Sequence, residues 1–121
     1  MNLRIAARLC MAVLAALGPS CEGGGPPTLV LHNDGLHLAT VTLVETIEVR
    51  DDTANSTFND TTTMFEDLKP GQTLTREFSY DLKTLEVEVV RTGDGMVVLR
   101  RTYSMGDFDG AKNELEIVVR P

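Results

Sequence analysis

The stretch that decides the fold is Thr84–Tyr103, TLEVEVVRTGDGMVVLRRTY, because two alternating segments flank a glycine-rich turn. Apolar and acidic side chains alternate in the first segment, and apolar side chains again occupy every second position early in the second. Alternation of this kind is typical of strands that bury one face, and the turn between the segments indicates a β-hairpin. We therefore expect a fold built from antiparallel β-structure.

The register of this hairpin can be predicted from the side chains that must share a face. A tight two-residue turn on Asp94-Gly95 would set Val89 opposite Arg100 and mix core with solvent on one face, which a period of two disfavours. A loop of three or five residues avoids this mixture. The predicted pairs are Val89 with Val97, Val87 with Leu99, and Glu86 with Arg100.

Strand-like runs recur along the rest of the chain, separated by clusters of turn-forming residues. This spacing predicts an all-β fold, a single antiparallel β-sandwich of about seven strands spanning residues 28–121, either immunoglobulin-like or transthyretin-like. The polar segments Asp51–Thr63 and Ser104–Asn113 are expected to be loops. The expected strands are Thr28–His32, Leu36–Arg50, Met64–Leu68, Thr73–Tyr80, Glu114–Arg120 and the two halves of the hairpin.

Two charged residues interrupt apolar strand faces. Glu45 breaks the long Leu36–Arg50 run, and a bulge or bend near Val44 that turns it to solvent is favoured over a buried carboxylate with a partner, because burying an unpaired charge is costly. Arg76 interrupts the face of Thr73–Tyr80, which indicates that this strand lies near a sheet edge.

Length and charge restrict the kinds of function. A chain of 121 residues supports one domain with its own core. Lysine and arginine total 11 against 18 aspartate and glutamate residues, which argues against a nucleic-acid partner because such proteins need a basic face.

The first 20 residues have the pattern of a secretory signal peptide. Arg4 and Arg8 precede an apolar run, Leu9–Leu17, that is too short to span a membrane. The segment ends in Leu17-Gly18-Pro19-Ser20-Cys21, which resembles the lipobox of bacterial lipoproteins in an atypical form, with glycine where that family usually has leucine. The resemblance implies that Cys21 is acylated and becomes the first residue of the mature protein.

Cys21 has an alternative fate. Ordinary cleavage near Ser20 would leave a free thiol in an oxidising compartment, since Cys10 would be removed and no internal disulfide could form. If Cys21 is acylated instead, residues 21–27 form the lipidation site and a Gly/Pro tether. A tether of this kind would hold the domain off the membrane to which the lipid attaches it.

The segment Lys69-Pro70-Gly71-Gln72 has proline and glycine at its two central positions, which predicts a type II turn. Together with its neighbours, the run Leu68–Leu74 resembles the turn that enters a strand in immunoglobulin-like bacterial envelope domains. The resemblance implies an envelope β-sandwich.

The sequence gives little indication of a metal site or a catalytic site. His32, Asp34 and His37 flank the first turn but fall short of a structural zinc set. No G-x-S-x-G elbow is present in the sequence, so we predict no catalytic residue, no cofactor and no enzymatic activity.

A weak calcium site is the sharper hypothesis for the acidic loops. If successive strands cross the full height of a sandwich, the loops alternate between two ends. Asp51–Thr63, Asp81–Lys83 and Ser104–Asn113 would then meet at the end where the tether enters. Solvated turn residues are the favoured interpretation of their acids, because aspartate is common in turns. The alternative is a calcium site there. The candidate ligands are Asp51, Asp52, Asp107 and Asp109.

These patterns predict an exported, lipid-anchored protein of the cell envelope with an interaction or structural role. Its expected contacts are the membrane, through the lipid, and a protein or surface partner. A calcium- or small-ligand-binding β-sandwich is the first alternative, and a small envelope hydrolase is the second. The two alternatives differ from the interaction or structural role in requiring acidic or polar side chains that converge in a pocket.

Overall fold

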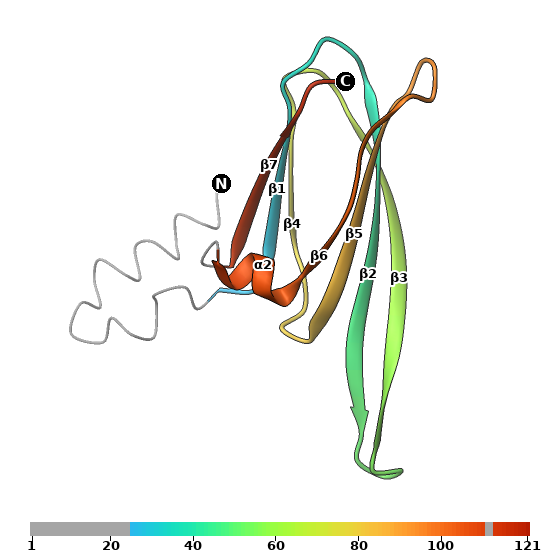
Figure 1. Cartoon of the computed structure of the whole chain (residues 1–121), viewed down its shortest axis with the longest axis vertical. Coiled ribbons are helices and arrows are strands. Elements are labelled where there is room, and N and C mark those ends of the chain that lie inside the picture. Colours follow the sequence, from blue (N-terminus) through green and yellow to red (C-terminus); the bar gives the residue numbers. More distant parts are fainter. Residues whose placement is uncertain (1–24, 111–112) are drawn as a thin grey trace, which may run out of the picture.

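Two facing sheets make up most of the computed structural model, which describes residues 25–110 and 113–121, without the side chains of Asp109 and Gly110 (Figure 1). The three-stranded sheet has the order β4 (Thr73–Glu77), β1 (Thr28–Asn33), β7 (Glu114–Val119). The four-stranded sheet has the order β3 (Ser56–Leu68), β2 (Ala39–Asp51), β5 (Leu82–Arg91), β6 (Val97–Ser104). The short helix α2 (Met105–Gly110) connects β6 towards β7.

This arrangement confirms the predicted β-sandwich of about seven strands. The central strand β1 runs antiparallel to β4 and parallel to β7. In an immunoglobulin constant domain the first strand shares its sheet with the second, fifth and fourth strands. Here it shares its sheet with the fourth and the seventh, so the strand order is not that of an immunoglobulin domain.

The core lies between the two sheets and follows the period of two along each strand. Leu85, Val87 and Val89 of the hairpin are fully buried, as the alternation in Thr84–Tyr103 predicted. Burying one such side chain contributes about 1.5–3 kcal/mol. The other core residues are Leu29, Leu31, Ala39, Val41, Leu43, Leu68, Leu74, Phe78, Leu82, Tyr103, Phe108 and Val119.

The predicted register of the β5–β6 hairpin is wrong, although the apolar faces of β5 are right. Arg100 lies opposite Glu88, not Glu86, and its Nε donates a hydrogen bond to Glu88 Oε2 at 2.8 Å. The strands are therefore displaced by two residues from the prediction. The observed pairs are Val89 with Leu99, Val87 with Arg101, and Glu86 with Thr102.

A β-bulge explains the displacement. Val90 pairs with Val97 while Val89 pairs with Leu99, so Val98 is an extra residue on β6. Beyond the bulge the loop closes with Arg91 N donating to Met96 O at 2.8 Å. The predicted register requires a ladder without bulges, whereas the one extra residue lets a four-residue loop keep the apolar faces in phase.

The prediction that Asp51–Thr63 forms a loop is wrong. Only a short turn separates β2 from β3, and β3 runs for 13 residues from Ser56 to Leu68, absorbing the short strand expected at Met64–Leu68. Most of β3 is exposed, so it shows no apolar alternation. Its threonines nevertheless favour extended backbone because their branched side chains fit a pleated surface.

The predicted loop Ser104–Asn113 is partly wrong, because it contains the helix α2. Phe108 on this helix is fully buried. Asp107 Oδ2 accepts a hydrogen bond from Ser104 N at 2.8 Å, which is the capping contact of a helix N-terminus. The sequence therefore contained a helix signal at Ser104–Asp107, but the helix is too short for a periodic pattern.

Glu45 is half-buried and paired with Thr62 in a β2–β3 ladder that has no bulge at Val44. The irregularity lies further along, between Thr46 and Ile47, in the pairing of β2 with β5. The predicted bulge was therefore misplaced. Arg76 does lie on an edge strand, β4, as predicted, and its guanidinium contacts Glu66 Oε1 of β3 at 2.7 Å across the open side of the sandwich.

The connections alternate between the two ends of the sandwich, as predicted (Figure 1). At the far end, Asn33 N donates to Gln72 O at 3.0 Å and Thr92 N donates to Leu38 O at 2.9 Å. At the end where β1 begins, which we call the tether end, Thr28 N donates to Asn113 O at 2.8 Å.

The turn at Lys69–Gln72 is of type II, as predicted. Gly71 has a φ of 81°, and Gln72 N donates to Lys69 O at 3.0 Å. The strand that follows, β4, ends at Glu77 rather than Tyr80, and β2 begins at Ala39 rather than Leu36.

The signal peptide and Cys21 lie outside the described residues. Of the expected tether, residues 25–27 are described, and they contact the sandwich. Pro27 is fully buried and its carbonyl oxygen accepts a hydrogen bond from Phe78 N at 2.8 Å. Gly25 O accepts one from Asn113 Nδ2 at 2.9 Å.

Candidate functional site

The hairpin of β2 and β3 extends past the rest of the sandwich at the tether end (Figure 1). Pairing between β2 and β5 ends at Ile47 with Leu82, whereas pairing between β2 and β3 continues to Asp51 with Ser56. We call residues 47–60 the arm. Because each strand residue advances the chain by roughly 3.3 Å, five rungs make the arm about 17 Å long.

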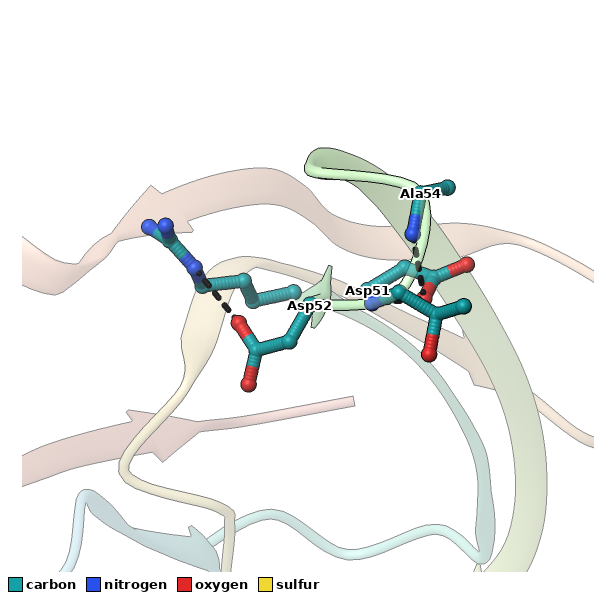
Figure 2. A network of polar contacts seen from close by, with 5 residues as sticks. Asp51, Asp52 and Ala54 are labelled. Carbon is teal, nitrogen blue, oxygen red and sulfur yellow. Dashed lines mark hydrogen bonds and ion pairs between the residues drawn. The ribbon is translucent and has the colours of Figure 1, made fainter.

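The tip of the arm is held by its own polar contacts, which Figure 2 shows. Asp51 Oδ1 accepts hydrogen bonds from Thr53 N at 3.0 Å and Ala54 N at 3.2 Å. Arg50 Nε donates to Asp52 Oδ1 at 2.9 Å. Asn55 has a positive φ of 51°, a conformation that asparagine tolerates better than most residues. The arm therefore ends in a defined turn.

One face of the arm carries three apolar side chains, of which Ile47 and Val49 are half-buried and Phe58 is exposed. Ile47 and Val49 continue the alternation that buries Val41 and Leu43 further up β2, but the three-stranded sheet does not reach over the arm (Figure 1). Phe58, which lies opposite Val49 in the ladder, is 53% exposed. The side of the four-stranded sheet that faces the core therefore becomes partly exposed along the arm.

The outer edge of β3 is unpaired by any strand among the described residues. Proteins usually protect such an edge with charged side chains, lysine above all, or with proline, a bulge or a very short strand. β3 is 13 residues long, contains neither lysine nor proline, and has a regular ladder with β2; its charged residues are Asp60, Glu66 and Asp67, of which Glu66 is paired with Arg76. Phe65 on its outer face is 71% exposed. The arm and this edge are the strongest candidate for a functional surface.

The structure separates most of the predicted calcium ligands. Asp51 and Asp52 stand at the tip of the arm, away from α2 (Figure 1), and Asp107 caps α2. The side chain of Asp109 is outside the description, so the site stays a prediction. Within residues 25–110 and 113–121, no three His, Cys, Asp or Glu side chains come together to hold a metal.

His32 and His37 lie in different surroundings. The His32 ring lies between β4 and β7, with Nδ1 at 2.8 Å from Thr73 Oγ1 and Nε2 at 2.7 Å from Glu116 Oε2. His37 is exposed in the loop before β2. Asp34 Oδ2 accepts a hydrogen bond from Arg120 at 3.2 Å.

Two surface hollows are lined mainly by loops. One at the far end has a volume of about 540 Å³, and one at the tether end has about 490 Å³. In the tether-end hollow Lys83 accompanies Glu48 and Asp81, so it lacks the concentrated negative charge that calcium requires. The far-end hollow is lined by His37, Leu38, Arg91, Thr92, Gly93 and Asp94.

Within residues 25–110 and 113–121, three titratable groups have clearly shifted pKa values, and all three lie on or beside the β5–β6 hairpin. Burial raises the pKa of Tyr103, and Arg101, whose guanidinium lies 5.3 Å from the ring centroid, opposes this. The hydrogen bond from Arg91 lowers the pKa of Asp94, and Glu88 raises the pKa of Arg100. Each shift has a local structural cause, and none lies on the arm.

Asn33, which the sequence placed only in a turn, stabilises the fold through its side chain. It is almost fully buried, and its Nδ2 donates to Leu68 O and to His37 O, both at 2.9 Å. Its Oδ1 accepts from Gly35 N at 2.9 Å. The turn cluster at residues 33–35 could have indicated this side-chain bonding, since asparagine often bonds its own loop.

Comparisons with known proteins support the fold only. No protein family and no curated protein matches the chain. A solved structure titled "Trapped Toxin" is similar over 62% of this chain, with a TM-score of 0.51 and 12% sequence identity. The match spans 18% of that longer chain. Among the described residues, no helix is long and apolar enough to cross a membrane.

Proposed function

We propose that this chain is an exported, lipid-anchored protein of the cell envelope that binds a protein partner through the arm and the β3 edge. It has no catalytic role in this proposal. The observation that carries the binding role is the 13-residue edge of β3, which has no strand partner among the described residues, no proline and no bulge, and which continues into a two-stranded arm. An extended peptide segment of a partner can add to such an edge through main-chain hydrogen bonds.

The apolar side chains at this surface support the same role. Phe58 and Phe65 flank the edge on opposite faces of β3, at 53% and 71% exposure. Aromatic side chains are enriched in binding surfaces because they bury much area with little loss of conformational freedom. A strand added at β3 would cover part of both.

The proposed anchor would hold this surface near the membrane. Residues 25–27 contact the sandwich, so residues 22–24 would separate it from Cys21, and they can span at most about 11 Å when fully extended. The arm points to the same end at which β1 begins (Figure 1). The partner is therefore expected at the membrane surface, where the lipid on Cys21 would concentrate both proteins.

The lipid anchor can be tested at Cys21. We expect mass spectrometry of the mature protein to find a diacylglyceryl-type modification on Cys21, and Cys21→Ala to release the protein from the membrane fraction. Two acyl chains suffice for stable anchoring, so the shift between fractions should be nearly complete. Ser20→Ala is the matched control, because alanine still supplies a small residue before the cysteine. An unmodified Cys21 at the mature N-terminus would refute lipidation.

The contact surface can be tested by photo-crosslinking in intact envelopes. A photoreactive residue at Phe65 is expected to give a crosslinked species. The same residue at Val118, which is 48% exposed on the other sheet, should give none. Equal crosslinking at both positions, or none at Phe65, would contradict the proposed role of this edge.

A further inference from the structure

The arm lacks a third strand. Isolated two-stranded ribbons are marginally stable in water, and a third strand or a covering layer is needed for stability. Glu48 N still donates to Asp81 O at 3.1 Å, but from Val49 to Asp51 the arm has neither, because β5 ends and the second sheet does not reach it. A strand bound along β3 would supply what the arm lacks.

Two copies of β3 have complementary side chains when they pair in one particular antiparallel register. With Thr61 opposite the partner's Thr61, Phe58 meets the partner's Met64. No two acidic side chains oppose each other in this register. Met64 is partly buried against the core, so the partner's Phe58 would extend that core. The remaining pairs are Thr57 with Phe65, Asn59 with Thr63, Asp60 with Thr62, and Ser56 with Glu66.

The neighbouring registers are worse. Pairing centred on Asp60 sets two carboxylates directly opposite each other, and pairing centred on Thr63 sets Asp60 against Glu66. Centring on Thr62 sets Phe58 against Glu66, which already binds Arg76. Registers between these would place core-facing residues of one copy against outer-face residues of the other. Like charges directly opposite are destabilising in a sheet.

We propose that a second copy of this chain is the partner, and that the two copies pair antiparallel along β3 with Thr61 on the two-fold axis. The inference rests on the proposed function of the β3 edge and names its occupant. The pairing joins two four-stranded sheets into one of eight strands. Arm residues 56–60 of each copy then lie beside residues 62–66 of the other, so both arms gain a third strand.

Disulfide mapping in intact envelopes tests this register with the full chain. Thr61→Cys should form a covalent dimer on oxidation, because the residue opposes itself. Thr63→Cys and Thr57→Cys are matched controls on the same face. Their cysteines would lie about 13 Å and about 26 Å from their counterparts at roughly 3.3 Å per residue, too far for a disulfide. The parent chain controls for Cys10 and Cys21.

A dimer from Thr61→Cys alone supports the proposal. Dimers from Thr63→Cys instead, from all three variants equally, or from none would overturn it. Photo-crosslinking at Phe65 separates the two hypotheses. A crosslinked species that contains another protein, without a Thr61→Cys dimer, refutes self-pairing and leaves the proposed function intact. Absence of both refutes both.

Charge placement gives a second measurement, in sedimentation of the detergent-solubilised protein. In a Glu45→Gln background, which removes the acidic group that lies opposite Thr62 within the same chain, Thr62→Asp sets a carboxylate against the partner's Asp60 at two symmetric positions, which should weaken the dimer roughly tenfold. Combining it with Asp60→Asn should restore the affinity. An unchanged dimer in Thr62→Asp, or a monomeric parent at every concentration, contradicts the proposal.

Discussion

Replacing Phe108 by alanine is expected to lower the free energy of unfolding by about 3–5 kcal/mol. The side chain is fully buried on α2, where it packs into the core formed by both sheets. Its removal would leave a cavity that a six-residue helix cannot collapse to fill. The loss is a large part of the roughly 5–15 kcal/mol that stabilises a typical domain.

Urea denaturation followed by circular dichroism measures this loss. Phe108→Leu, which keeps most of the volume, should cost about 1.5 kcal/mol or less and remains measurable if the alanine variant does not fold. Leu36→Ala is the control at a residue that is 88% exposed, and it should change stability by less than about 0.5 kcal/mol. A loss below about 1 kcal/mol for Phe108→Ala would place Phe108 outside the core.

Replacing Asn33 by leucine should cost about 3 kcal/mol, because it leaves buried hydrogen-bonding groups without partners. The side chain bonds the carbonyl oxygens of His37 and Leu68 and the amide of Gly35. These three contacts fasten the loop between β1 and β2 to the end of β3. Losing them should also raise amide hydrogen exchange in that loop.

The same denaturation experiment, with a different set of variants, checks this prediction. Asn33→Asp keeps the shape of the side chain but, when ionised, has no donor for His37 O or Leu68 O, so it should be destabilised as well. Asn59→Leu is the same change at an exposed strand position and should be nearly neutral at protein concentrations low enough to exclude association. If Asn33→Leu is also neutral, the buried bonds contribute nothing to stability.

The sequence predicted the strands whose side chains alternate against a core. Leu85, Val87 and Val89 are buried as expected, and the type II turn at Gly71 follows from a proline and glycine pair. These features depend on neighbours in sequence. Local periodicity and turn chemistry were therefore sufficient to predict them.

Features that depend on distant contacts could not be predicted. β3 shows no alternation of buried and exposed side chains, because five of its 13 residues belong to the arm and the others lie at a sheet edge. Its polar, threonine-rich sequence therefore predicted a loop. The bulge at Val98 changed the hairpin register without a glycine or proline to mark it. The arm arises because β5 is shorter than β2, a difference that only the assembled sheet reveals.

The parallel pairing of β1 with β7 sets the order in which this protein can fold. β1 precedes and β7 follows every other described strand, so their ladder joins opposite ends of the described chain. Contacts of such large sequence separation form slowly, because loop-closure entropy must be overcome before they stabilise the chain. Before β7 pairs, the chain has β1 and β3 with open edges and no closed sandwich. Pairing at β3 with another chain can therefore compete with completion of the fold.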